Sequence, residues 1–289
     1  MRVAVFGHGV PWGIFVPFDV PVEDVTLRAA RPAPQIAAYL EPFMDPFARA
    51  VLDGLAGGAF DGVDLLVFLR ESPGALPAFH YACDFARRGL LPADAPALHL
   101  LNLVPSNTPA AHRFNLTEID RLADVLGSAG GARSRFEMPP LPPLTRGAEV
   151  AGPRQALLGA PLGNTALQEG LARLGPLVLD QQAEDAARAA AGDTIDAALA
   201  AQAANPFAAR QPGDLYLPAV ASHLAERQVE RVVWQVDAHD DLWGWLMPDL
   251  RALAEKAGVA FVDLGVLPRW PSAEELSPVL ERLAKDGAV

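Results

Sequence analysis

Residues 237–241 bring together the side chains that most readily bind cations or move protons. They read Asp237-Ala238-His239-Asp240-Asp241, so three carboxylates and one imidazole lie in one loop after an apolar run. Such groups can ligate a divalent cation or act as general acids and bases. The alternative is a solvated loop whose aspartates cap the next helix, because a carboxylate there accepts free main-chain N–H groups. Both interpretations stay open from these residues alone.

Two tryptophans follow this loop directly. Trp243 and Trp245 stand on either side of a glycine. A large aromatic side chain in a loop is costly unless it covers apolar surface, such as that of a ligand or a partner protein. We therefore take Trp243 and Trp245, together with Asp241, as candidate contacts to a ligand or partner, and we add Trp12 near the first apolar run.

A glycine-rich turn follows that first apolar run. It reads Gly7-His8-Gly9, with Gly13 further along. Phosphate-binding turns use such glycines to bring main-chain N–H groups close to the ligand. Here the spacing to Gly13 departs from that pattern, and a proline and Trp12 stand where a helix should begin. A simple turn at the end of a strand is therefore favoured over a dinucleotide site.

The composition indicates a folded protein with a sizeable core. Of 289 residues, 51% are hydrophobic and 20% are charged. The net charge of −12 argues against a nucleic-acid binder, which needs clustered Lys and Arg. Cys83 is the single cysteine, so an internal disulfide within this chain is excluded. No apolar run approaches the roughly 18–20 residues that cross a bilayer, and because the run after Arg2 is short we expect no signal peptide. We expect a cytoplasmic protein without membrane contact.

Short apolar runs alternate with amphipathic stretches along the chain. The runs predict buried strands, and the stretches with apolar residues three and four apart predict helices. Strands separated by helices form βαβ units, and these build parallel sheets covered on both faces. We predict an α/β fold with two flavodoxin-like lobes, each a roughly four-stranded parallel sheet flanked by helices. The predicted strands are residues 3–7, 64–69, 97–104, 155–158, 177–179, 231–236 and 260–264. The predicted helices are residues 47–55, 77–88, 115–126, 165–174, 183–204, 217–228, 248–256 and 273–285.

A stretch rich in glycine and proline divides the chain near its middle. Residues 128–131 are small, and residues 138–144 read MPPLPPL, a stiff segment. We predict an N-terminal α/β lobe of residues 1–130, a Pro-rich linker of residues 131–150 and a C-terminal α/β lobe of residues 151–289. Ligands of such sheets bind beyond the carboxyl ends of the strands, so function is expected in the loops there.

A series of segments over most of the chain carries a family resemblance. They are residues 45–49 (DPFAR), 60–73 (FDGVDLLVFLRESP) and 157–180 (LLGAPLGNTALQEGLARLGPLVLD), together with residues 13–30, 98–105, 114–126 and 232–264. Taken in order, they resemble the 2-hydroxyacyl-CoA dehydratase and benzoyl-CoA reductase subunit family. The resemblance implies two lobes, CoA-ester substrates and a dimer of related subunits.

The resemblance also assigns three positions to iron–sulfur ligands. Each cluster-bearing subunit of the family holds its cluster on three cysteines and passes single electrons to a CoA ester. The matching positions here are Asp45, Ser72 and Asp240, and none of them is a cysteine. Iron–sulfur clusters need sulfur ligands, whereas carboxylate and hydroxyl oxygens suit hard cations such as Mg²⁺. We predict that this chain carries no iron–sulfur cluster, no other cofactor and no resident metal.

Two functions follow from these observations, and whether the chain is an enzyme stays open. The first is an accessory pseudoenzyme that pairs with a cluster-bearing homologue, or with a second copy of itself, around an acyl-CoA ester. Glu23 matches the family's Pro-x-Glu segment, which implies a role near the substrate. The second is a cluster-independent lyase acting on an acyl-CoA or small acid. Its candidate catalytic groups are Glu23, Ser72 and His239 with Asp45 and Asp240, where a divalent cation could act as a Lewis acid.

Overall fold

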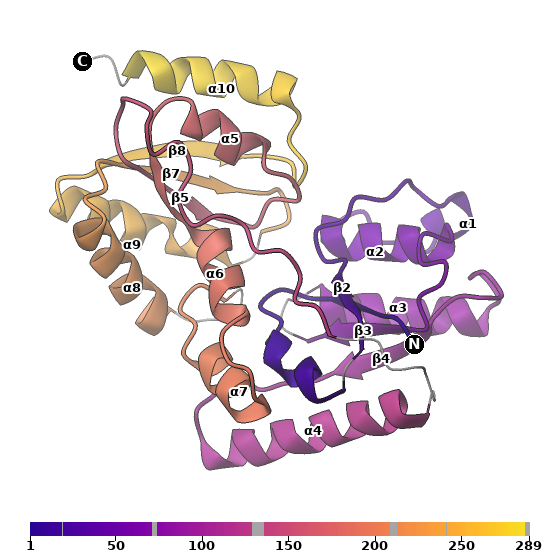
Figure 1. Cartoon of the computed structure of the whole chain (residues 1–289). Coiled ribbons are helices and arrows are strands. Elements are labelled where there is room, and N and C mark those ends of the chain that lie inside the picture. The colour runs from indigo at the N-terminus through magenta and orange to yellow at the C-terminus, as the bar shows by residue number, and fades with distance from the viewer. Residues whose placement is uncertain (19, 71–73, 129–135, 209–212, 241, 287–289) are drawn as a thin grey trace. The chain divides into compact units, whose positions relative to one another are not determined.

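The chain folds into two compact units, which we describe separately in a computed structural model (Figure 1). The structure describes residues 1–18, 20–70, 74–128, 136–208, 213–240 and 242–286. Unit 1 consists of Met1–Pro140 and Ala186–Arg210, and unit 2 of Leu141–Asp185 and Gln211–Val289.

Unit 1 is built on a four-stranded parallel sheet. Its strand order is β2-β1-β3-β4, and every neighbouring pair is parallel. Its two central strands, β1 and β3, are short, apolar and fully buried, which suits a sheet covered on both faces. The strands are β1 (Val3–Phe6), β2 (Val22–Asp24), β3 (Leu65–Leu69) and β4 (Ala97–Leu101).

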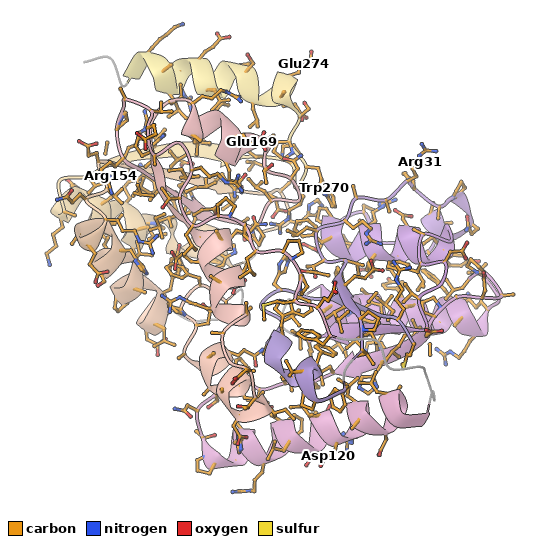
Figure 2. The ribbon with its side chains drawn as sticks, viewed as in Figure 1. Arg31, Asp120, Arg154, Glu169, Trp270 and Glu274 are labelled. Carbon is orange, nitrogen blue, oxygen red and sulfur yellow. The ribbon has the colours of Figure 1, made fainter. Side chains whose placement is uncertain are left out.

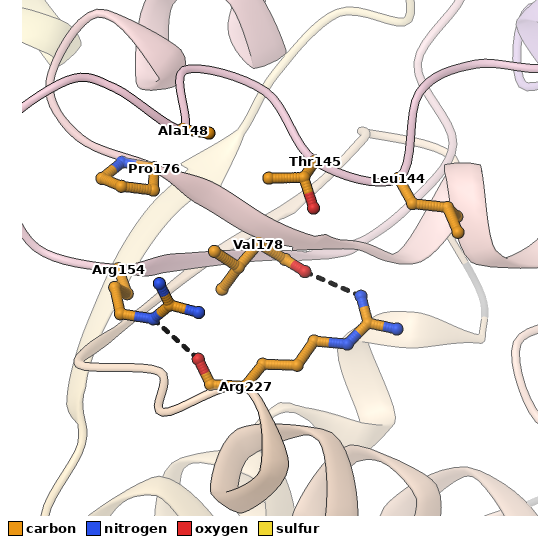
Figure 3. A pocket seen from close by; sticks show the side chains of 7 residues that line it. All are labelled: Leu144, Thr145, Ala148, Arg154, Pro176, Val178 and Arg227. Atoms are coloured by element: carbon orange, nitrogen blue, oxygen red, sulfur yellow. Dashed lines mark hydrogen bonds between the residues drawn. The ribbon is translucent and has the colours of Figure 1, made fainter.

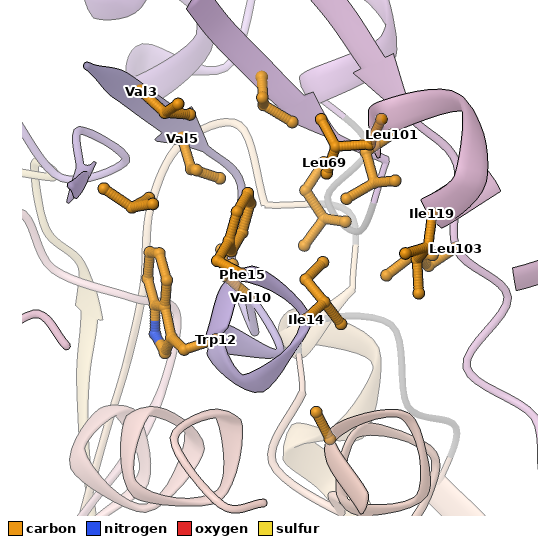
Figure 4. Close-up of a cluster of buried hydrophobic side chains, with 14 of the residues drawn as sticks. Val3, Val5, Val10, Trp12, Ile14, Phe15, Leu69, Leu101, Leu103 and Ile119 are labelled. Carbon is orange, nitrogen blue, oxygen red and sulfur yellow. The ribbon is translucent and has the colours of Figure 1, made fainter. Parts of the chain in front are cut away.

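Alternate residues of these strands supply two hydrophobic layers. Val3 and Val5 face one layer, where they pack with residues of the 3₁₀ helix η1 (Trp12–Phe18) and of helices α4 (Pro109–Ser128) and α7 (Ile195–Ala203) (Figure 4). Phe6 and Phe68 contact each other edge to face on the opposite side, where Phe68 also meets α3. The helices of that side are α1 (Pro34–Ala37), α2 (Pro46–Ala56) and α3 (Ala75–Arg87).

Unit 2 repeats the same strand order. Its sheet runs β6-β5-β7-β8, again with all neighbours parallel. Helices α5 and α10 pack together on one face over an apolar cluster, and α8 and α9 cover the other. Charged side chains such as Glu169 and Glu274 lie at the outer surface of these helices (Figure 2). The strands are β5 (Gln155–Gly159), β6 (Leu177–Asp180), β7 (Arg231–Val236) and β8 (Ala260–Val266); the helices are α5 (Ala166–Ala172), α6 (Gln181–Ala189), α8 (Gly213–Glu226), α9 (Trp243–Lys256) and α10 (Ala273–Asp286).

The predicted fold class is confirmed: both sheets are four-stranded, parallel and flanked by helices. Several elements differ from the prediction: η1 and α1 were not predicted, and α9 begins at Trp243 instead of residue 248. Two further differences have a clear physical cause. The fourth strand of unit 1 is β2, whose three residues are too few to show a period in the sequence. The predicted single helix of residues 183–204 is two helices, α6 and α7, separated by a turn at Gly192 with φ of +91°.

The turn at Gly192 also explains why the division into units departs from a simple split of the chain. After it, α7 packs against η1, so residues Ala186–Arg210 group with unit 1 although they follow β6 in sequence. A Cβ at Gly13 in η1 would meet the Gly192 carbonyl and lie 2.8 Å from Ala198 Cβ. The segment Ala186–Arg210 therefore belongs to unit 1 because its main chain packs closely against that of η1.

Among the described helices, none is both long enough and apolar enough to cross a membrane.

Replacing Gly13 by alanine should destabilise unit 1, because the new methyl group overlaps the Gly192 turn. Overpacking of this kind costs about 1–3 kcal/mol of unfolding free energy. Urea unfolding measures the loss. Gly127→Ala is the matched control, because no atom lies within 4 Å of a Cβ there and Gly127 lies in the last turn of α4. The control should be unchanged or up to about 1 kcal/mol more stable. Equal stability of the Gly13 variant and wild type would contradict the packing described here.

Candidate functional site

Both sheets have the strand order at which doubly wound folds bind ligands. In unit 1 the chain winds from β1 to β2 on one side and then to β3 on the other. In unit 2 the corresponding strands are β5, β6 and β7. Ligands of such sheets occupy the crevice beyond the carboxyl ends of the strands, where the winding reverses. The loops after β1 and β3, and those after β5 and β7, are therefore the candidate sites.

In unit 1 the turn after β1 is fixed by one threonine. The Gly7 N–H donates to Thr26 Oγ1 over 2.9 Å, and the Thr26 hydroxyl donates to the Gly7 carbonyl over 3.0 Å. A Cβ at Gly7 would lie 2.7 Å from Leu69 Cβ. His8 places its ring edge-on to that of Phe47, with centroids 5.5 Å apart. The glycine therefore serves close packing of β1 against β3, as a strand-exit turn does.

Asp45 lies at the start of α2 and caps that helix. Its Oδ1 atom accepts a hydrogen bond of 2.9 Å from the Ala48 N–H, and Pro46 follows Asp45 as the first residue of the helix. A Cβ at Gly74 would lie 3.3 Å from the same oxygen, so the residue before α3 lies next to Asp45. Ser72 lies outside the described residues. Unit 1 thus brings the Asp45 segment to the beginning of α3, with the carboxylate bonded to a helix N-terminus.

The other two candidates of unit 1 have partners within the unit. Glu23 on β2 pairs with Arg28 over 3.1 Å and with Arg2 over 3.5 Å, in a partly exposed network. Trp12 is buried in the core, where its ring packs near that of Phe15 at 6.3 Å. The Trp12 ring is therefore covered by the protein's own side chains.

In unit 2 the loop after β7 is held by a buried ion pair. Asp237 Oδ2 lies 2.5 Å from Arg269 Nη2, and the two side chains are only 3% and 8% exposed. Arg269 also donates from Nη1 to the Pro161 carbonyl over 2.9 Å. Three loops, those after β5, β7 and β8, are therefore tied together by one carboxylate and one guanidinium. Removing either partner would leave the other charge buried and uncompensated.

His239 lies beside this ion pair with part of its ring open to solvent. Its main-chain N–H donates to Asp237 Oδ1 over 2.7 Å, and its Nδ1 atom lies 3.6 Å from the same oxygen. The side chain is 30% exposed. A carboxylate next to Nδ1 orients the imidazole, and an oriented imidazole that is partly open to solvent is a candidate for general acid–base chemistry.

Asp240 caps the following helix, as the second interpretation of this loop supposed. Its Oδ1 accepts from the Trp243 N–H over 3.1 Å, and its Oδ2 accepts from the Gly244 N–H over 2.6 Å. Both carboxylate oxygens therefore serve the N-terminus of α9. Asp241 lies outside the described residues.

The two tryptophans of this segment have opposite environments. Trp243 is buried and its ring packs on that of Tyr216, with centroids 5.2 Å apart. Trp245 is 82% exposed in the first turn of α9. Trp245 is thus the one of the pair whose ring is available for contact with another molecule.

Glutamine side chains hold the remaining loops of unit 2. The Gln181 amide accepts from the Gly159 N–H and donates to the Gly159 carbonyl, and Tyr216 donates its hydroxyl to the same amide oxygen over 2.6 Å. Gln182 bonds both main-chain groups of Leu162 in the same way. These side chains replace missing backbone partners, which is required where main chain is buried outside a sheet.

Asp180, at the end of β6, is a fully buried acid of this region. Burial raises the pKa of its carboxyl to about 6, although hydrogen bonds from the main chain of Gln182 and Ala183 and the charge of Arg146 act to lower it. Burial dominates because a charged carboxylate loses its hydration there.

No sequence pattern singles out Asp180, Arg269 or the two glutamines, although ligands are expected in their loops. Each is a single polar residue next to an apolar strand, a weak signal without the strand order. Within the described part of the chain, no three side chains among His, Cys, Asp and Glu gather as a metal-binding group.

Asp180→Asn should alter the pH dependence of stability. The folded pKa of Asp180 is raised, so its contribution to stability is complete below the unfolded pKa near 4 and is lost as the pH rises through about 6. Asparagine does not titrate, so the variant does not lose stability over this pH range. Its stability relative to wild type should rise by about 2 kcal/mol between pH 4 and pH 7. Urea unfolding across that range measures it, and a constant difference would show that Asp180 is not titrating in this way.

Neither a scan against protein-family models nor a search of curated proteins finds a match to this chain.

Proposed function

We propose that this chain is a cluster-free accessory subunit of the 2-hydroxyacyl-CoA dehydratase type. It would act in the cytoplasm by pairing with a cluster-bearing homologue, or with a second copy of itself, and help to bind an acyl-CoA ester. The observation that carries the proposal is the role of two carboxylates. Asp45 and Asp240, which the resemblance places at cluster-ligand positions, each accept main-chain N–H groups at the start of a helix.

The chemistry of these groups favours a subunit without its own cluster. Iron in such clusters is bound by thiolates, and the oxygen donors of Asp45 and Asp240 do not fit that requirement. A capping carboxylate stabilises its helix by about 1 kcal/mol and fixes the loop without any metal. Single-electron chemistry on a CoA ester would therefore depend on the partner's cluster, and this chain would contribute shape and binding groups.

The repeated architecture supports the same proposal. The two units share one strand order, and the family that the sequence resembles is also two-lobed. Trp245 offers an exposed aromatic ring beside the Asp240 loop, and exposed aromatic side chains are enriched where proteins contact one another. A partner of the same fold is the occupant that the proposal assigns to this surface.

Restoring the cysteines tests the alignment on which the proposal depends. The triple variant Asp45→Cys, Ser72→Cys, Asp240→Cys should take up iron and sulfide on anaerobic reconstitution, because it regains three thiolates at the assigned positions. Absorbance near 400 nm and metal analysis measure the uptake. The matched control carries Asp120→Cys, Glu169→Cys and Glu274→Cys, at three exposed positions, and should gain no defined cluster. Equal uptake by a folded triple variant and its control would contradict the assignment.

One observation favours a second candidate, a cluster-independent lyase. The Asp237 carboxylate, itself paired with Arg269, orients the half-buried His239 imidazole at the carboxyl end of β7. A histidine held in this way can remove the proton next to a substrate carbonyl and return it to the leaving hydroxyl as water departs. In this candidate the chain would turn over an acyl-CoA or small hydroxy acid by itself.

Replacing His239 separates the two candidates. If the purified chain alone dehydrates a 3-hydroxyacyl-CoA, His239→Gln should lower kcat by about 10²-fold or more, the usual contribution of a general base. His80→Gln is the control, because His80 is an exposed histidine of unit 1, on α3. The accessory proposal expects no turnover by the chain alone and no effect of either change on binding to the cluster-bearing partner.

A further inference from the structure

Unit 2 contains a pocket at the amino ends of its strands, on the opposite edge from the loops discussed above. It has a volume of about 390 Å³ and is lined mainly by Leu144, Thr145, Arg154, Pro176, Val178 and Arg227 (Figure 3). Pockets of roughly 300–1,000 Å³ are the size that holds small molecules. Arg154 and Pro176 directly precede β5 and β6, so the pocket opens where these strands begin.

One of the two arginines of this pocket is neutralised. Arg227 donates from Nη1 to the Val178 carbonyl over 2.7 Å, and its Nη2 pairs with the Glu184 carboxylate. These bonds fix the guanidinium against β6 and α6. Arg227 therefore lines the pocket and, through its carbonyl, holds Arg154 in place, while its own charge is compensated by Glu184.

The other arginine keeps its charge available. Arg154 donates from Nε to the Arg227 carbonyl over 2.8 Å, which fixes the plane of its guanidinium. Among the described residues, none pairs with its two terminal nitrogens. The Glu230 carboxylate accepts a hydrogen bond from the Arg154 main-chain N–H instead. Figure 3 shows the terminal nitrogens pointing away from that support, into the pocket.

The walls around Arg154 define the rest of the ligand. Leu144, Pro176 and Val178 supply apolar surface, and the Thr145 hydroxyl faces the same space (Figure 3). No carboxylate lines the pocket among the described residues. An oriented guanidinium binds a planar carboxylate with two parallel hydrogen bonds, and the apolar wall favours a hydrocarbon part next to it.

From these contacts we infer that the pocket binds a small carboxylic acid with a short hydrocarbon chain, its carboxylate paired with Arg154. The site lies on the edge of unit 2 away from the β5 and β7 loops, so it does not depend on the function proposed for those loops. In a chain with a net charge of −12, a single uncompensated guanidinium gives the pocket its preference for an anion.

Thermal unfolding of the full chain with a series of sodium salts tests this site at constant ionic strength. Butyrate and hexanoate should raise the melting temperature more than acetate does, because a ligand of the folded state stabilises it. Butylammonium should give no rise. Arg154→Gln should weaken butyrate binding about tenfold or more, since it loses a charge-assisted pair. Arg282→Gln, at an exposed arginine on α10 outside the pocket, should bind like wild type.

A second measurement needs no variant and therefore stands even if Arg154→Gln does not fold. Butyrate should protect Arg154, but not Arg282, from modification by phenylglyoxal, as peptide mass spectrometry reports. Three results would overturn the inference: no acid-dependent stabilisation and no protection, a response that Arg154→Gln retains, or inorganic phosphate binding at least as tightly as butyrate. The last would assign the pocket to a phosphate instead of a carboxylate.

Discussion

Side-chain oxygens that accept main-chain N–H groups hold every described loop on which the candidate sites depend. A parallel sheet leaves its strands through buried turns, and the N–H groups of those turns and of the helices after them have no partner in the sheet. In unit 1 these acceptors belong to Thr26 and Asp45, and in unit 2 to Gln181, Asp237 and Asp240. The carboxyl edges of both units are therefore shaped by the protein's own hydrogen bonds.

Much of this fold could be predicted from the sequence, because buried parallel strands are continuous apolar runs. The strand β2 was not predicted, because Val22–Asp24 is too short to show a periodic pattern. The break between α6 and α7 was not predicted, because an alanine-rich sequence favours a continuous helix. The turn at Gly192 packs against Gly13, which lies in a distant part of the chain. Tertiary packing, which no local pattern contains, therefore decided the break between α6 and α7.

The candidate site was predicted in part. The loop Asp237–Asp240 was selected for its residue types, yet those types could not distinguish a cap from a ligand set. The distinction lies in geometry, since Asp240 bonds two N–H groups of α9 and Asp237 bonds an arginine thirty-two residues away. Trp243 and Trp245 looked equivalent in sequence, and only their positions on α9 separate the buried ring from the exposed one. Arg154 could not be selected from the sequence because it belongs to no motif. Its place in a pocket depends on residues next to α8 and β6 that are distant in sequence.

The account depends most on carboxylate oxygens standing at positions that the resemblance assigns to sulfur ligands of iron. Iron and acid-labile sulfide in wild-type protein, isolated under anaerobic conditions and never exposed to air, measure this directly. Colourless protein with far less than one iron per chain is the predicted result. Brown protein with stoichiometric iron and sulfide would contradict the account.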